Sequence, residues 1–174
     1  MTLPVRTARA QPAQASFAAA AEQHLDDVYG YLVYLTRDAS LAEDLTAETF
    51  EKALKLWRRF DPRRASARTW FCQIARTTAL DWFRAEERRR RREERAATPE
   101  RVDASLAEGL SPELEAALAS LSAGEREVIA LRVLLELDGD EAARVLGVSP
   151  TAVSTRLSRA LKKLEERMNA HVAV

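Results

Sequence analysis

The chain has 174 residues, of which 47% are hydrophobic, and its formal net charge is zero. This length allows one domain or two small ones with ordinary cores, and the low count of five glycines and six prolines favours a helical protein. The single cysteine, Cys72, excludes an intramolecular disulfide, and we expect it to fill a small space in a core. His24 and His171 are too few and too far apart for a zinc site, and no run of about 18 uncharged apolar residues occurs. We therefore expect a cytoplasmic protein with no metal, no cofactor and no membrane insertion.

The zero net charge conceals four blocks of alternating sign. Residues 22–56 carry a net charge of −5 and residues 93–141 carry −9, whereas residues 57–92 carry +8 and residues 142–174 carry +4. A charged run is often only a solvated helix face, but cations also bind nucleic-acid phosphates, which acidic blocks repel. Because both basic blocks carry other features typical of nucleic-acid binding, we infer two DNA-facing surfaces and at least one protein-facing surface.

The first half of the chain predicts a flexible tail followed by a helical domain over residues 16–92. Residues 1–15 lack periodicity, and an apolar stripe then begins a helix: Phe17, Ala21, His24, Leu25, Val28, Leu32 and Leu35. Ser40 and Glu43 predict a capping box for a second helix, which ends at Asp61-Pro62. The expected core side of this second helix carries Leu41, Leu45, Phe50, Leu54 and Trp57. Ser66 is expected to cap a third helix, which runs into the arginines at 88–92.

The second half predicts a flexible linker over residues 93–111 and a second helical domain over residues 112–170. Ser111-Pro112 begins a helix through Leu121, and Ser122 with Glu125 forms another capping box before the apolar residues 128–135. The predicted fold is therefore all-α, with two small helical domains joined by a flexible linker.

Residues 138–164 have the layout of a helix-turn-helix. Asp138 opens a short helix, Gly147-Val148 turns the chain, and Ser149-Pro150 begins a second helix through Leu164. The core side of that helix is expected to carry Val153, Leu157, Ala160, Leu161 and Leu164. The opposite side carries short polar side chains and cations, as helices in the DNA major groove do: Thr151, Ala152, Thr155, Ser158, Arg159 and Lys162. An ordinary amphipathic helical hairpin is the alternative interpretation.

The segment from Trp57 to Arg84 mixes aromatic residues with arginines. Single-stranded nucleic acid binds such mixtures, because cations follow the phosphates while unstacked bases pack on aromatic faces. The alternative is that Trp70, Phe71 and Trp82 belong to a hydrophobic core.

Four ordered motifs resemble bacterial RNA polymerase sigma factors of the compact extracytoplasmic-function (ECF) type, over about residues 17–167. The first motif is residues 41–50, and the second is residues 69–76 with Leu80, Asp81 and Arg84. The third is residues 126–132, and the fourth is residues 146–149 with Arg156-Leu157 and Arg159-Ala160-Leu161. The resemblance implies a promoter-specificity subunit without enzymatic activity of its own, whose partners are core RNA polymerase, promoter DNA and an anti-sigma factor.

The resemblance also implies a role for each block. The acidic helix would bind the clamp helices of the largest polymerase subunit, and the polymerase flap is a further expected contact of the chain. The residues expected to bind polymerase are Glu43, Asp44, Glu48, Thr49 and Lys52. The basic and aromatic segment would melt and bind the minus-ten element through Arg63, Arg64, Ser66, Arg68, Thr69, Trp70, Arg76, Thr77 and Arg84. The helix-turn-helix would read the minus-thirty-five duplex through Ser149, Thr151, Ala152, Thr155, Arg156, Ser158 and Arg159.

Five positions depart from the usual pattern of the family. Thr77 stands where asparagine is usual, which puts the minus-ten preference in question, and Ala47 replaces the usual glutamine. Ala152 and Ser154 replace the usual threonine and lysine and thereby remove a hydroxyl and a cation from the recognition region. Gly139 replaces the usual aromatic residue, so we expect a weakly anchored helix start there.

Two other functions fit parts of the sequence. A stand-alone helix-turn-helix regulator would bind duplex DNA tightly without polymerase. A DNA-processing enzyme would need a phenol nucleophile, and Tyr29, Tyr31 and Tyr34 are available, but they lie beside the acidic block and far along the chain from the arginines.

Overall fold

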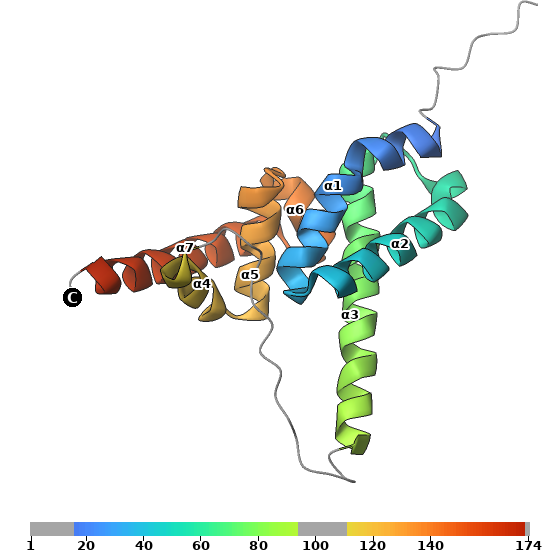
Figure 1. Cartoon of the computed structure of the whole chain (residues 1–174). Helices are drawn as coiled ribbons and strands as arrows, with labels where there is room; N and C mark the ends of the chain where they lie inside the picture. Colours follow the sequence, from blue (N-terminus) through green and yellow to red (C-terminus); the bar gives the residue numbers. More distant parts are fainter. Residues whose placement is uncertain (1–15, 94–110, 173–174) are drawn as a thin grey trace, which may run out of the picture.

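The computed structural model describes residues 16–93 and 111–172, and every regular element in these ranges is helical (Figure 1). Helices α1 (Phe17–Thr36), α2 (Ala39–Leu56) and α3 (Ala67–Glu93) pack on one another and form the first domain. Helices α4 (Pro112–Ala119), α5 (Ala123–Ile129), α6 (Gly139–Leu146) and α7 (Pro150–Val172) form the second. The predicted tail, and the predicted linker between Glu93 and Ser111, lie outside the described residues.

The first domain has a core of large apolar side chains. Val28, Leu32 and Phe71 are completely buried, and Leu45 is nearly so. The expected stripes were partly wrong, because Leu25 is 47% exposed on α1 and Leu54 is 57% exposed on α2. The buried face of α2 instead carries small and hydroxyl side chains: Ala42, Thr46, Thr49 and Ala53. Together with Leu45, these side chains are the buried residues of α2, which packs on α1 and α3.

The predicted capping box at Ser40 was wrong. Asp38 is the N-cap of α2, and its carboxylate accepts a hydrogen bond from the Leu41 amide at 3.0 Å. Aspartate and serine are about equally good caps, so two candidates two residues apart could not be ranked from the sequence. The end of the helix also differs, since α2 stops at Leu56 and a 3₁₀ turn, η1 (Trp57–Arg59), comes before Asp61.

The second domain begins as predicted, with Ser111 capping α4 and the Ser122–Glu125 capping box starting α5. Helix α5 continues as a π-helix, η2 (Ala130–Leu134), within the predicted run 128–135. The turn of the helix-turn-helix is confirmed, because Gly147 has a φ of 68°, a left-handed conformation that glycine adopts without steric cost.

Three expectations about the helix-turn-helix were wrong. The start of α6 is well anchored despite Gly139, because Asp138 and Glu141 form a reciprocal capping box. Two hydrogen-bonded partners at the helix start replace the aromatic packing that glycine lacks. Helix α7 extends past Leu164 to Val172, and Leu161 is 46% exposed rather than buried.

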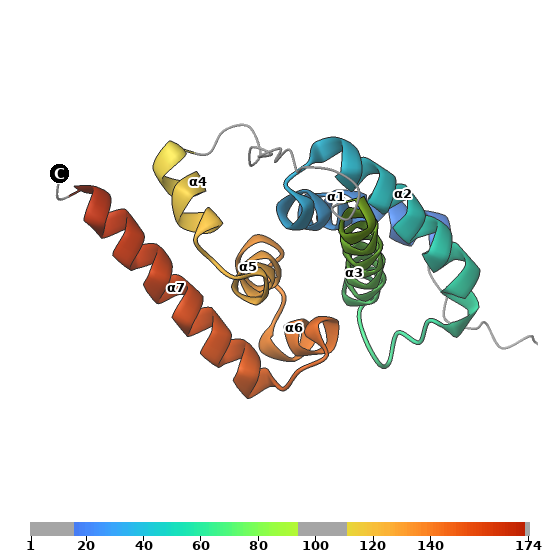
Figure 2. The ribbon, with the colours of Figure 1, turned by 90° about the horizontal axis from the view of Figure 1, so that it is seen from below.

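The two domains contact each other. Helices α5, η2 and α6 approach α1 and α3, as both views show, whereas α7 lies on the far side of the second domain (Figures 1 and 2). The first helix of the helix-turn-helix therefore lies against the helix that was expected to bind minus-ten DNA.

Candidate nucleic-acid and polymerase interfaces

The start of α3 is built from a tight turn and a serine cap. The Asp61 side chain accepts a hydrogen bond from the Arg63 amide at 2.9 Å, and the Asp61 carbonyl accepts one from the Arg64 amide at 3.0 Å. The predicted Ser66 cap is confirmed, since its hydroxyl accepts a hydrogen bond from the Thr69 amide at 3.2 Å. This turn leaves the side chains of Arg63 and Arg64 exposed directly before the helix.

The minus-ten candidates fall into three groups. Arg63, Arg64, Thr77 and Arg84 are exposed, although Thr77 donates to the Gln73 carbonyl at 2.9 Å and Arg84 pairs with Asp81 at 3.2 Å. Arg68 and Trp70 are half-buried. The remaining candidates, Ser66, Thr69 and Arg76, lie on the side of α3 that faces the second domain.

Glu141 of α6 binds the start of α3. The hydroxyl groups of Ser66 and Thr69 donate to Glu141 Oε1 at 3.0 and 2.9 Å. Burial alone raises the pKa of the Glu141 carboxyl, but hydrogen bonds from Thr69, the Asp138 amide and Ser66 outweigh it and lower the pKa below its ordinary value. Glu141 is therefore held as a carboxylate at this contact.

Glu127 of α5 binds Arg76 in the next part of the same face. Arg76 Nε donates to Glu127 Oε1 at 2.8 Å, and Arg76 Nη2 donates to Oε2 at 3.3 Å, which is a two-pronged ion pair. Tyr31 of α1 also donates to Glu127 Oε1, at 3.5 Å. Burial raises the pKa of Tyr31 well above its usual value, and the negative charge of Glu127 raises it further. Tyr31 thus remains a neutral donor, and at 1% exposure it is not available as a nucleophile.

Sequence reasoning missed Glu127 and Glu141 as functional candidates. Glu127 stands beside a buried run of apolar residues, and a buried carboxylate needs a hydrogen-bond or ion-pair partner. Its position in the sequence could therefore have indicated a paired carboxylate. Glu141 stands three residues after Asp138, so the sequence indicated a role in a capping box and gave no sign of its contact with α3.

The aromatic residues of this segment pack on one another. Trp57 stacks on Phe60 with ring centroids 4.8 Å apart and lies 5.7 Å from Trp70. Phe71 is fully buried beneath them, 6.0 Å from Trp57. Core packing therefore accounts for Phe71, and in this conformation Trp70 also lies within the aromatic cluster.

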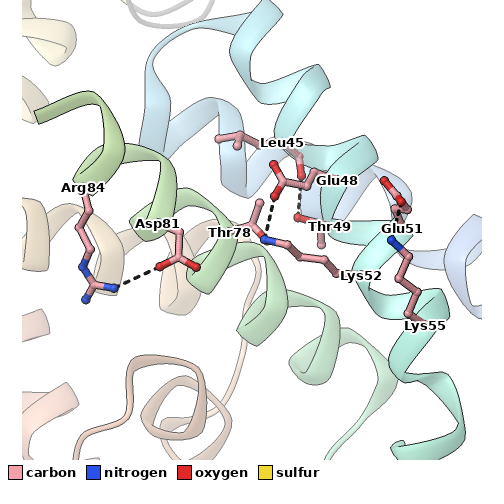
Figure 3. Close-up of polar contacts among 9 residues, drawn as sticks. All are labelled: Leu45, Glu48, Thr49, Glu51, Lys52, Lys55, Thr78, Asp81 and Arg84. Carbon is pink, nitrogen blue, oxygen red and sulfur yellow. Dashed lines mark hydrogen bonds and ion pairs between the residues drawn. The ribbon is translucent and has the colours of Figure 1, made fainter. Parts of the chain in front are cut away.

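The predicted polymerase surface lies on α2 (Figure 3). Glu43, Asp44 and Glu48 are exposed. Lys52 joins α2 to α3, because its ammonium group pairs with Glu48 at 2.8 Å and donates to the Thr78 hydroxyl at 3.2 Å. Thr49 is fully buried, and its hydroxyl donates to the Leu45 carbonyl at 2.6 Å, so its side chain is not part of the exposed surface.

The outer face of α7 is open at its N-terminal end. Thr151, Thr155, Ser158 and Arg159 are exposed. The exposed Ser149 caps the helix by accepting from the Ala152 amide at 3.2 Å. Ala152 and Arg156 are half-buried, so they lie at the edge of this face.

Metal and membrane sites are absent from the part of the chain that the structure describes. No group of three or more His, Cys, Asp or Glu side chains is placed to hold a metal ion there. Within the same residues no helix is long and apolar enough to cross a bilayer.

Known proteins with similar sequences match this arrangement along the chain. Residues 20–89 match the family described as Sigma-70 region 2, and residues 111–164 match Sigma-70, region 4. The ECF RNA polymerase sigma factor SigX of Bacillus subtilis (strain 168) is 30% identical over 161 residues, which cover 82% of this chain and 78% of SigX. SigC of Mycobacterium tuberculosis (strain CDC 1551 / Oshkosh), also an ECF sigma factor, is 37% identical over 138 residues, covering 77% of this chain and 73% of SigC.

A solved structure has the same fold. The sigma factor RpoE from Bartonella quintana, crystallised with the anti-sigma factor NepR, superposes with a TM-score of 0.74 at 22% identity and covers 88% of this chain and 96% of RpoE. The matches account for both domains, and they do not favour a stand-alone regulator, whose first domain would be unrelated to a sigma factor. This chain belongs to the ECF family of RNA polymerase sigma factors, which direct promoter-specific initiation of transcription.

Proposed function

We propose that three surfaces of the chain divide the work of initiation. The acidic surface of α2, formed by Glu43, Asp44, Glu48 and Lys52, binds the clamp helices of core polymerase. Exposed carboxylates on a rigid helix are suited to a positively charged groove, because complementary charge guides association and sets orientation.

The start of α3 and the preceding loop open and hold the minus-ten element. Arg63, Arg64 and Arg84 supply exposed cations for phosphates, and Ser66, Thr69, Arg76 and Thr77 supply donors for an unpaired strand. Arg68 and Trp70 lie beside them at half-buried positions. Extruding a base from the duplex costs a few kcal/mol, and contacts of these side chains with the unpaired strand offset that cost.

The helix-turn-helix reads the minus-thirty-five duplex through the outer face of α7. This face carries the proposal furthest, because Ser149, Thr151, Thr155, Ser158 and Arg159 stay exposed on a helix whose opposite side buries Val153 and Ala160. Ala152 and Arg156 border this face. Ala152 supplies only a methyl group, which fits an apolar contact with thymine.

The chain itself performs no chemical step and acts in the cytoplasm together with the polymerase. Its regulation by an anti-sigma factor is supported by family membership, and NepR provides a solved example for RpoE.

The test is transcription in vitro with purified core polymerase. We expect start sites that appear only when both the core and the chain are present, on promoters first identified by mapping transcripts after overexpression. Tight, specific duplex binding by the free chain without any polymerase-dependent start would contradict the proposal and favour a stand-alone regulator.

A further inference from the structure

Two buried hydrogen-bond donors at the C-terminal end of α1 have no acceptor among the described residues. They are the hydroxyl group of Tyr34 and Nε of Arg37, and neither atom is exposed to solvent. Tyr34 lies in the last turn of α1, and Arg37 is the C-cap three residues later, so both belong to the same end of the helix. Buried donors in proteins are almost always hydrogen-bonded, so two that lie this close together indicate a shared acceptor.

The guanidinium group of Arg126 lies near the same place. Helix α5, which carries Arg126, contacts α1. Burial raises the pKa of Tyr34, and the positive charges of Arg126 and Arg37 partly oppose this rise, which requires both charges to be close to the phenol. Arg126 Nη1 donates to the Leu121 carbonyl at 2.5 Å, and this bond uses one of the five N–H groups of the side chain.

The two guanidinium charges are not balanced by a carboxylate in residues 16–93 and 111–172. Neither Arg37 nor Arg126 forms an ion pair there. The acids next to them in the sequence are engaged elsewhere, because Asp38 caps α2, Glu125 pairs with α7 and Glu127 pairs with α3. Half-buried cations of like charge that lie near each other are unfavourable unless an anion accompanies them.

An oxyanion of the phosphate class has the chemistry that these groups require. Its oxygens accept several hydrogen bonds at once, and guanidinium groups bind it through two parallel N–H bonds. A phosphate group also carries about 1.5 negative charges at neutral pH, which offsets most of the charge of two arginines. A water molecule could accept from the same donors, but it would leave the two positive charges uncompensated.

We propose that Tyr34, Arg37 and Arg126 bind the oxygens of a small phosphate, either the free ion or the terminal phosphate of a nucleotide. Tyr34 donates one neutral hydrogen bond, and the two arginines supply the charge. None of the three residues belongs to the surfaces proposed for polymerase or promoter DNA, so the site is independent of the proposed function.

The test is isothermal titration calorimetry of the full-length chain with inorganic phosphate, in chloride buffer at constant ionic strength. We expect saturable binding to the wild type, and binding at least about tenfold weaker in the double variant Arg37→Gln with Arg126→Gln. Arg58→Gln with Arg59→Gln is the matched control, because it removes the same two charges from an exposed turn of the first domain. The control should bind phosphate within about twofold of the wild type.

Tyr34→Phe tests the phenol without changing any charge. We expect it to weaken phosphate binding by about tenfold, because a hydrogen bond to a charged group is worth roughly 1.5 kcal/mol or more. Circular dichroism establishes that each variant keeps its helix content. If the arginine double variant does not fold, Tyr34→Phe and the phosphate-induced shifts of the arginine Nε signals in ¹H–¹⁵N spectra of the wild type provide the comparison.

A second titration with a nucleoside triphosphate, and with the unphosphorylated nucleoside as its control, identifies the source of the phosphate. Tighter binding of the triphosphate than of inorganic phosphate assigns a nucleotide, whereas equal or weaker binding assigns the free ion. The site is overturned if neither ligand binds saturably up to about 10 mM, or if the Arg58 and Arg59 control loses as much affinity as the Arg37 and Arg126 variant. Polymerase takes no part in these measurements, so their outcome does not depend on the proposed function.

Discussion

Arg159 is an exposed cation in the outer face of α7, and substituting it tests duplex reading at the scale of one side chain. We expect Arg159→Ala to weaken binding of the holoenzyme to minus-thirty-five DNA by about 1–3 kcal/mol, the usual value of a two-pronged contact to a base. Arg167→Ala removes the same charge near the other end of α7 and is the matched control. Equal effects of the two variants, measured by competition between promoter sequences, would exclude Arg159 from base reading.

Glu125 links two helices of the second domain and gives a pH-dependent prediction. Its carboxylate pairs with Lys163 of α7 at 2.6 Å and accepts from the Ser122 amide at 2.9 Å. The hydrogen bond from Lys163, and then those from Ser122, lower the pKa of Glu125 from 4.5 to about 2. Because the folded pKa lies below the unfolded one, the stabilisation is complete above pH 4.5 and is lost as the pH falls toward 2.

We therefore expect Glu125→Gln to lower the free energy of unfolding by about 1 kcal/mol at neutral pH, since glutamine keeps the capping box but loses the charge. Urea titrations at neutral pH and below pH 4.5 measure the difference, which should shrink in acid. Lys163→Gln should reduce stability by a similar amount. A difference that grows as the pH falls would contradict this assignment.

At the scale of elements, the acidic surface of α2 gives a test of polymerase docking. Asp44 is exposed on a helix whose other side is packed, so Asp44→Arg should leave the fold within about 0.5 kcal/mol of the wild type. We expect at least about tenfold weaker assembly with core polymerase, because the substitution places like charges across the proposed contact. Asp26→Arg makes the same change at an exposed position of α1 and should assemble normally. Normal assembly of the Asp44 variant, measured by fluorescence titration, would refute this docking surface.

Helix starts and turns were the elements that the sequence predicted best. Ser66, Ser111, Ser122 and Asp138 each cap the expected helix, and Gly147 makes the expected turn, because these features depend on residues within one turn of the chain. Burial was predicted less well. Leu54 and Leu161 are exposed because their surroundings are set by which neighbouring helices pack nearby, and no local pattern contains that information.

At the scale of the whole molecule, the contact between the domains could not be predicted from the sequence. Charge blocks indicated two DNA-facing surfaces and at least one protein-facing surface, and the partner surface that α3 meets carries Glu127 and Glu141 of the second domain. The sequence contained no indication that this partner surface belonged to the same chain. Pairs such as Arg76 and Glu127 are 51 residues apart, beyond the range of any helical or strand periodicity.

The contact between the two domains should weaken as ionic strength rises. Raising salt from about 0.05 M to about 0.5 M screens the attraction between the basic α3 and the acidic side chains of the second domain that face it, so we expect the radius of gyration of the wild type to increase. The Glu127→Gln chain should show a smaller increase, because the ion pair with Arg76 is already gone. A wild-type radius that stays constant across this range would show that charge does not hold the domains together.

Cys72 has a practical consequence for measuring the distance between the two domains. The thiol is completely buried, and burial, more than the nearby Asp27 charge, raises its pKa to about 12. At neutral pH the reactive thiolate is therefore almost absent, and thiol-directed reagents are excluded from it. Cysteines introduced on the exposed faces of α2 and α7 can then carry a donor and an acceptor dye while the native thiol stays in place. Energy transfer between the two dyes, measured on single molecules, can then report how often the two domains separate before and after polymerase is added.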